Sequence, residues 1–512
     1  MHLLCYFFTV CFTISGTSLL QARLEHWDWR AVDLNAITLP SIMGTSVSEY
    51  QVSGAHNCPH SNWAHWEGKK IHNGRPTIQG NDWSGSACNF WHSCYQDIAL
   101  IKQLGCNSFR FSIEWSNIEP QEGQFCQEAI NHYRDFCVGL RHAGIEPMIT
   151  LHHFTHPHWF EQKGGFANAE NIHYFVRFCE RVFTQLSSQV TLWCTINEIG
   201  PFVFQGYIQG VFPPGLSGDL WTALNVMRTM MQAHCAVYKA LKALPGGDKA
   251  QIGLVHQYLT IESHTTSYMQ PALQMLGTYA AGATLWSMWA SLVPKTTKFR
   301  TSWALGVAAL GALNPVERIP AWFMTYIFND ALMHFLKTGT VFPFIPGLRL
   351  TIADGRDCCD FIGLNFYSRV VIESRLIAYV LSGGVGECAF PHCRQGELMT
   401  DMEYGVCPEG LYAAIKDMSQ FGKPIYITEN GVADKHDDIR ALWIKRYLYA
   451  VSKALADGYD VRGYYYWSLM DNFEWDRGYG QRFGLYEVDR ITQQRRLRHS
   501  AQCYAEAIER QR

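Results

Sequence analysis

Short apolar strands alternate with amphipathic helices along almost the whole chain. Between the strands, apolar residues recur at helical spacing, first from Phe90 to Leu104 and again from Ile130 to Leu140. Because consecutive parallel strands need a crossover that is usually a helix, this alternation favours a parallel sheet. The eight predicted strands are Pro40–Thr45, Ser108–Ile113, Pro147–His152, Leu192–Asn197, Gln251–His256, Asp360–Phe366, Pro424–Thr428 and Arg462–Ser468.

Eight strand–helix units predict an α/β fold, a closed (β/α)8 TIM barrel with elaborated loops after its strands. The alternative is a doubly wound open sheet, but no glycine-rich dinucleotide fingerprint follows the first strand. The length of 512 residues would allow about three domains. Since no linker, repeat or low-complexity run interrupts the pattern, we predict a single barrel domain.

The charge balance argues against a nucleic-acid partner. The chain has 42 Lys and Arg against 45 Asp and Glu, a net charge of −3. Binding to a phosphate backbone requires an excess of basic residues, which this composition does not supply. We therefore expect no nucleic acid among the partners.

The N-terminus carries an apolar run over residues 3–14, followed by the small residues Ser15 to Ser18. We interpret residues 1–20 as a signal peptide or short anchor, although Met1 and His2 provide no positive charge ahead of the run. The 17 cysteines and the absence of any Asn-x-Ser/Thr sequon do not decide the compartment. Localisation stays open: secreted or membrane-associated if the run is a signal, cytoplasmic otherwise. The sequence predicts no oligomeric state.

The connection between the fifth and sixth predicted strands is unusually long, with an apolar stretch near residues 266–312. Residues 269–293 carry no charged side chain and are long enough to span a membrane. Glycine, glutamine and hydroxyl residues dilute this hydrophobicity, so we favour helices that pack on the barrel flank. Membrane contact through residues 3–14 or 269–293 is the weaker alternative.

Two predicted strands end in a carboxylate beside an asparagine, namely Asn197-Glu198 on the fourth and Glu429-Asn430 on the seventh. A carboxylate that closes an apolar strand is costly when it is buried without a partner. Each glutamate alone could simply cap the following helix. Because the carboxyl ends of barrel strands meet at one rim, the pair instead indicates two carboxylates in one cavity, as glycoside hydrolysis requires.

Longer motifs extend this interpretation. The chain resembles glycoside hydrolase family 1, the β-glucosidase-type retaining β-glycosidases, over roughly residues 39–505, with residues 266–312 as an insertion. The resemblance implies one catalytic (β/α)8 domain. The matching segments are 44–46, 50–52, 110–116, 150–153, 197–198, 360–367, 428–431, 467–475 and 482–484.

The resemblance implies a role for each of five catalytic residues. Glu198 matches the general acid/base and Glu429 the nucleophile of a double-displacement mechanism. Arg110 and Tyr367 match the residues that hold the nucleophile, and Asn197 matches the amide that contacts the sugar 2-hydroxyl. This chemistry requires no metal and no organic cofactor.

The resemblance also implies a substrate-binding set around one sugar. Its members in this chain are Gln51, His153, Asn365, Trp467, Glu474, Trp475 and Phe483. The crowding of His152, His153, His156 and His158 could suggest zinc, but no cysteine or carboxylate follows at a useful spacing. Family members that take 6-phospho-glycosides carry Ser, Lys and Tyr in the segment around and after 474–475. Here that segment contains Glu474 and Asp476, which would repel a phosphate.

The sequence therefore predicts a hydrolase of small, unphosphorylated O-linked β-glycosides. β-Glucosides lead, and β-galactosides or β-fucosides remain open because the predicted sugar-binding residues do not separate epimers. Two alternatives stand beside this prediction. One is a non-catalytic, carbohydrate-binding or receptor-like relative, and the other is a transglycosidase in which an acceptor replaces water. The retained carboxylates argue against the first.

Overall fold

The computed structural model describes residues 24–511 apart from 26, 35, 72–73, 264–323, 344, 346, 375–388 and 393–397. The predicted leader at 1–20 and the predicted apolar insertion at 266–312 therefore lie outside the described residues. Among the described helices, none is long and apolar enough to cross a membrane.

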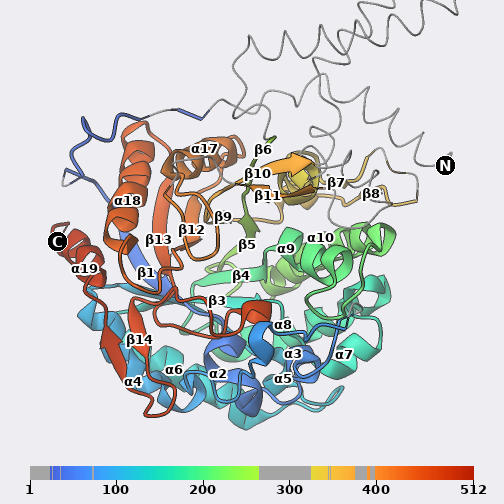
Figure 1. Cartoon of the computed structure of the whole chain (residues 1–512). Coiled ribbons are helices and arrows are strands. Elements are labelled where there is room, and N and C mark those ends of the chain that lie inside the picture. The colour runs from blue at the N-terminus through green and yellow to red at the C-terminus, as the bar shows by residue number, and fades with distance from the viewer. Residues whose placement is uncertain are drawn as a thin grey trace, which may run out of the picture.

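Eight parallel strands close into a barrel in the order β1-β13-β12-β9-β5-β4-β3-β2 (Figure 1). This confirms the predicted fold class, and each strand lies within one or two residues of its predicted range. The barrel strands are β1 (Ile42–Ser46), β2 (Ser108–Ser112), β3 (Glu146–His152), β4 (Leu192–Asn197), β5 (Gln251–Gln257), β9 (Phe361–Asn365), β12 (Ile425–Asn430) and β13 (Val461–Trp467).

Helices surround the barrel and fill the connections between its strands (Figure 1). The described α-helices are α2 (Glu49–Asn57), α3 (Asn62–Trp66), α4 (Phe90–Gln103), α5 (Trp115–Ile118), α6 (Gln127–His142), α7 (His158–Gln162), α8 (Ile172–Leu186), α9 (Ile199–Val203), α10 (Leu220–Ala243), α15 (Ala331–Thr338), α17 (Pro408–Ser419), α18 (Arg440–Ala456) and α19 (Ala501–Glu509). Several begin at a side-chain cap; the Asp219 carboxylate, for example, accepts a hydrogen bond from Thr222 N at 3.1 Å where α10 starts.

Three small sheets decorate the barrel. One joins β11 (Ala389–His392), β10 (Arg369–Ser374) and β6 (Thr260–Ser263), and the last two of these follow β9 and β5 directly. The other two pair β14 (Tyr486–Val488) with β15 (Arg495–Leu497), and β7 (Thr340–Val341) with β8 (Leu350–Thr351).

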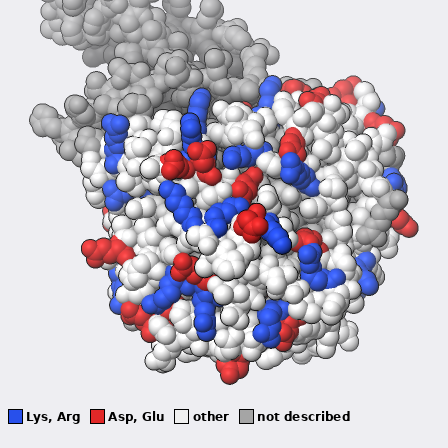
Figure 2. Space-filling model, turned by 180° about the vertical axis from the view of Figure 1, so that it is seen from behind, with Lys and Arg blue, Asp and Glu red and all other residues white. Residues whose placement is uncertain are grey.

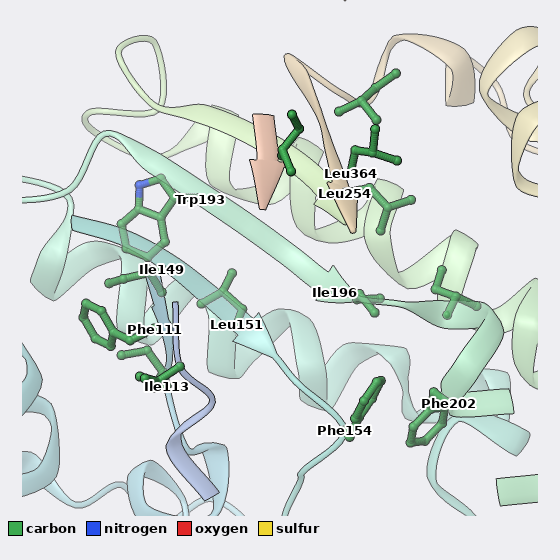
Figure 3. Packing of buried hydrophobic residues seen from close by; sticks show 14 of the residues in the cluster. Phe111, Ile113, Ile149, Leu151, Phe154, Trp193, Ile196, Phe202, Leu254 and Leu364 are labelled. Carbon is green, nitrogen blue, oxygen red and sulfur yellow. The ribbon is translucent and has the colours of Figure 1, made fainter. Parts of the chain in front are cut away.

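The alternation of side chains along each strand divides the core into two layers. Ile149 on β3 and Trp193 on β4 belong to the large cluster shared with the surrounding helices (Figure 3). Their neighbours Met148, Leu192 and Cys194 belong to a separate cluster inside the barrel. A strand residue beside an outward-facing one therefore points into the barrel.

Charged residues of both signs are interspersed over the face of the molecule shown in Figure 2. No extended basic patch is visible among the described residues on that face. The arrangement agrees with the small net charge of the whole chain, −3.

Candidate active site

Glu198 and Glu429 both lie at the carboxyl ends of barrel strands. Glu198 directly follows β4, and Glu429 is the second-last residue of β12. Only 6% of Glu198 and 3% of Glu429 is exposed, so both carboxyl groups are held largely away from water. Burial of two carboxyl groups needs specific partners for each.

The Glu429 carboxylate is held by a cation on one oxygen and a phenol on the other. Arg110 Nη1 donates to Oε1 at 2.6 Å, and the Tyr367 hydroxyl donates to Oε2 at 2.7 Å. His153 Nε2 lies 4.0 Å from Oε1. Burial, and then the positive charge of Arg110, hold the pKa of His153 well below its usual range, so this imidazole is neutral at neutral pH. Arg110 is therefore the cation that balances the carboxylate.

Arg110 reaches this position because of strand alternation. Its neighbours Phe109 and Phe111 pack against Phe136 of α6, which turns the arginine toward the barrel interior. There Nη2 donates to Asn197 Oδ1 at 2.7 Å, and Nε donates to Thr150 Oγ1 at 3.0 Å. One guanidinium thus links β2, β3, β4 and β12.

Glu198 occupies a different electrostatic environment. Its partner is an amide, because Asn365 Nδ2 donates to Oε1 at 2.7 Å. Burial, and then the nearby charge of Glu429, raise the pKa of Glu198 well above its ordinary value. Its backbone has a φ of 48°, a left-handed conformation that is unusual for a residue with a side chain and marks the sharp turn from β4 into α9.

A second group of polar residues lies beside the two carboxyls. Gln51 of α2 donates through Nε2 to Glu474 Oε2 at 3.1 Å and to the Phe473 carbonyl at 3.0 Å. Burial, and then the charge of Asp476, raise the pKa of Glu474 to about 8. Burial raises the pKa of Asp476 to about 6, and Arg477 Nε lies 3.8 Å from its carboxylate.

Aromatic rings line the same region. Trp467, the last residue of β13, clusters with Phe483 and Tyr367. The His153 ring stacks at 5.8 Å from the Trp467 ring and at 6.2 Å from the Trp475 ring. Such faces suit the apolar side of a pyranose ring.

All twelve residues predicted for the site therefore gather at one end of the barrel. Asn197 Nδ2 donates to His153 Nε2 at 3.2 Å, and Thr428 Oγ1 donates to Asn365 Oδ1 at 2.7 Å. These hydrogen bonds fix the orientation of the two asparagine amides. In the described part of the chain, no group of three or more His, Cys, Asp or Glu residues could hold a metal ion.

The sequence analysis missed two residues on the hairpin between β11 and α17. Met402 packs on the cluster of Trp467 and Phe483. Burial raises the pKa of Tyr404 to about 12, and the charges of Arg477, Glu474, Asp476 and Glu198 also act on its hydroxyl. These residues belong to a loop that carries no strand pattern, so only an alignment with relatives could have identified them.

A depression of about 630 Å³ lies at the opposite end of the barrel, lined by Arg141, Glu146, Tyr426 and other residues near the amino ends of the strands. It is distant from the carboxylates. The two glutamates lie at the carboxyl end, where a guanidinium and a phenol contact one of them and burial raises the pKa of the other. Such a pair can protonate a leaving group while a nucleophile attacks the opposite side of the same carbon.

Comparison with known proteins finds relatives along almost the whole chain. The model of glycosyl hydrolase family 1 matches residues 37–280 and 326–512. The chain is 30% identical over 491 residues to β-glucosidase A of Acetivibrio thermocellus, with 93% of this chain and 99% of the relative covered. It is also 30% identical over 509 residues to 6-phospho-β-galactosidase of Streptococcus mutans, with the same coverage of 93% and 99%.

Solved structures give the same result. The β-glycosidase from Pyrococcus horikoshii superposes with a TM-score of 0.72 at 31% identity, over 92% of this chain and 95% of that one. The β-glucosidase from Thermotoga maritima in complex with glucoimidazole superposes with a TM-score of 0.73 at 23% identity, over 93% and 99% of the two chains. At 23% identity, the similarity to the Thermotoga maritima enzyme supports a shared fold alone.

Proposed function

We propose that this chain, which belongs to glycosyl hydrolase family 1 and is a retaining β-glycosidase, hydrolyses small unphosphorylated β-glycosides with Glu198 as acid/base and Glu429 as nucleophile. β-Glucosides are the leading substrates, with β-galactosides and β-fucosides next. Residues 39–505 form its single catalytic domain in this proposal.

The observation that carries the assignment is the unequal environment of the two carboxyls. Glu429 receives hydrogen bonds from a buried guanidinium and a phenol, both of which stabilise its ionised form. Glu198 has a raised pKa, and in the part of the chain that the structure describes no cation contacts it as closely as Arg110 contacts Glu429. The carboxyl with the raised pKa takes the role of the acid, and the carboxylate that is hydrogen-bonded to the cation takes the role of the nucleophile.

In the first step, a Glu429 oxygen attacks the anomeric carbon while the bond from that carbon to the leaving oxygen breaks. Glu198 gives its proton to the leaving oxygen, so the aglycone departs as a neutral alcohol. In the second step, Glu198 is ionised and takes a proton from water, whose oxygen attacks the same carbon and releases Glu429. Two inversions give net retention.

The residues around the two glutamates support this two-step mechanism. Asn197 can contact the 2-hydroxyl, because Arg110 and His153 already fix the orientation of its amide. Gln51 and Glu474 present hydrogen-bonding groups for the hydroxyls on the far side of the sugar. Trp467 supplies an aromatic face for the ring.

The relatives named 6-phospho-β-galactosidase make phosphorylated sugars the second candidate. Against it, Glu474 and Asp476 place two carboxyl groups where a 6-phosphate would need cations. Arg477 is the nearby cation, and it is half exposed and faces Asp476. Asp476 already faces Arg477, and Glu474, with its pKa raised to about 8, supplies no cation for a phosphate dianion.

The roles of the two glutamates are tested by azide rescue. In Glu429→Ala, azide can occupy the space left by the nucleophile, so a single inversion should convert an activated aryl β-glycoside to the α-glycosyl azide. In Glu198→Ala, azide should instead intercept the covalent intermediate and give the β-glycosyl azide. The reverse stereochemistry in the two variants would overturn the assignment.

The substrate class is tested with a panel of nitrophenyl β-glycosides that includes glucoside, galactoside, fucoside and 6-phosphogalactoside, with Glu429→Ala as control. Turnover of the neutral sugars with at least tenfold preference over the phosphorylated one supports the proposal. Preference for the phosphorylated sugar would refute it. Transfer to an added alcohol in place of water would identify the transglycosidase alternative.

A further inference from the structure

Two cysteines that are far apart in the sequence meet on the flank of the barrel. Cys235 lies on α10, and Cys358 follows the short 3-10 helix at Gly355–Asp357 and precedes β9. Both are free thiols and each is only 2% exposed. Neither takes part in the glycosidase chemistry.

The two sulfur atoms approach the same short turn. Cys358 Sγ lies 3.4 Å from the carbonyl oxygen of Asp354, and Cys235 Sγ lies 3.9 Å from the carbonyl oxygen of Gly355, the next residue. Each thiol also shifts the pKa of the other, so the two sulfur atoms are near neighbours. This arrangement places both sulfurs against the same turn on the flank of the barrel.

The electrostatics of the pair are asymmetric. The hydrogen bond from Cys235 lowers the pKa of Cys358, and the charge of Lys239 acts in the same direction against burial and the carboxylates of Asp354 and Asp357. Lys239 is fixed beside the turn, where Nζ donates to the Ala353 carbonyl at 2.9 Å. The same thiol–thiol bond, together with burial, raises the pKa of Cys235. One thiol is thereby favoured as the thiolate, the reactive form of cysteine.

The turn is also close to water. Residues 353, 354, 356 and 357 are exposed, so only a thin layer separates Cys358 from solvent. A small oxidant needs only a local opening of this turn to reach the sulfur.

We propose that Cys235 and Cys358 are an oxidation site, at which a peroxide converts the two thiols into an intramolecular disulfide. The Cys358 thiolate attacks one peroxide oxygen, the O–O bond breaks, and sulfenic acid and water form. The Cys235 sulfur then attacks the sulfenic sulfur, and the S–O bond breaks with release of a second water. The two cysteines lose two electrons and two protons, and one hydrogen peroxide becomes two waters.

The disulfide would stabilise the folded protein as a covalent cross-link. It closes a loop of about 120 residues, which includes β5 and the whole connection to β9. Constraining a loop of this size in the unfolded chain stabilises the folded state. Because the link forms on the flank, away from the carboxyl ends of the strands, we expect oxidation to leave the kcat of the glycosidase within about twofold.

The test uses the full chain, treated with hydrogen peroxide or with dithiothreitol and then alkylated. The expected result is a peptide cross-link between Cys235 and Cys358 by tandem mass spectrometry, with both residues alkylated in the reduced sample. The oxidised protein should melt a few degrees higher than the reduced one.

Cys359→Ala is the matched control, because Cys359 is the neighbouring thiol and its Sγ donates to the Phe361 carbonyl at 2.6 Å. The cross-link and the peroxide-induced shift in Tm should persist in Cys359→Ala, and the shift in Tm should vanish in Cys358→Ala and Cys235→Ala. The cross-link in the wild-type protein can be measured even if one of the variants fails to fold. Absence of the cross-link after peroxide, a peroxide-induced shift in Tm that survives in Cys358→Ala, or over-oxidation of Cys358 without a disulfide would each overturn the proposal.

Discussion

Replacement of Arg110 by methionine isolates the contribution of the buried cation to catalysis. The guanidinium and the Glu429 carboxylate have 1% and 4% of their side chains exposed, and Nη1 lies 2.6 Å from Oε1. Methionine keeps much of the side-chain volume but removes the charge and its hydrogen-bond donors. The variant leaves Glu429 as a buried carboxylate whose close counter-charge is gone.

The size of the effect follows from the geometry. With charge centres about 4 Å apart and an effective dielectric of about 20, the lost attraction is about 4 kcal/mol. Breaking a buried ion pair by removing one partner costs about 3–5 kcal/mol, which agrees with that figure. At about 1.36 kcal/mol for each factor of ten, glycosylation of Glu429 should slow by about a thousandfold.

The rate to measure is inactivation by an activated 2-deoxy-2-fluoro β-glycoside, because covalent trapping reports the attack by Glu429 alone. Thr150→Val is the matched control, since it removes the hydrogen bond to Arg110 Nε at 3.0 Å and keeps the charge. It should slow trapping by less than about tenfold. Arg110→Lys keeps the positive charge but lacks the planar guanidinium. Its rate of trapping should lie between those of Thr150→Val and Arg110→Met.

Circular dichroism and Tm establish that each variant is folded. If folded Arg110→Met traps the sugar within tenfold of the wild-type rate, or no more slowly than Thr150→Val, then the cation does not sustain the nucleophile. The electrostatic argument for Glu429 would then be wrong.

Three further predictions follow from the same site. Tyr367→Phe removes one hydrogen bond of 2.7 Å to Glu429, so kcat/KM should fall about 10- to 100-fold with an unchanged Tm; a loss below threefold would contradict this. Asn365→Ala removes a hydrogen bond that lowers the pKa of Glu198, so the alkaline limb of the kcat/KM profile should move to higher pH, and a shift to lower pH would oppose the assignment. Glu474 has its pKa raised to about 8, so the folded state holds a proton that the unfolded chain releases, and stability falls as pH rises from about 4.5 to 8. Glu474→Gln should therefore lose less stability than wild type between pH 5 and pH 8 in urea denaturation, and an equal loss would refute the raised pKa.

Much of the barrel could be predicted because its signals are local. Each strand is a short apolar run, such as 192–197, and a strand in a helix-covered barrel is buried on both sides, so it needs no polar alternation. The carboxylates at 198 and 429 stood out for the same reason, since each interrupts an apolar segment at its carboxyl end.

Other features depend on contacts between distant segments. Arg110 could be named as a partner of Glu429 only through the family resemblance; its bonds to Asn197 and Thr150 join strands that no local pattern connects. Met402 and Tyr404 lie on a hairpin whose sequence shows no periodicity. Their position beside the site depends on contacts of the segment between β9 and α17 with residues near the C-terminus of the chain.

The sequence by itself determined the barrel, the strand ends that carry Glu198 and Glu429, and the family. Hydrophobic periodicity and short motifs are local features, so they can be recognised without the fold. Only the tertiary structure decided how the two carboxyls differ. Burial and the charge of Glu429 raise the pKa of Glu198, while a guanidinium from another strand balances Glu429. Charge–charge energies depend on distance and burial, and both exist only after the barrel closes.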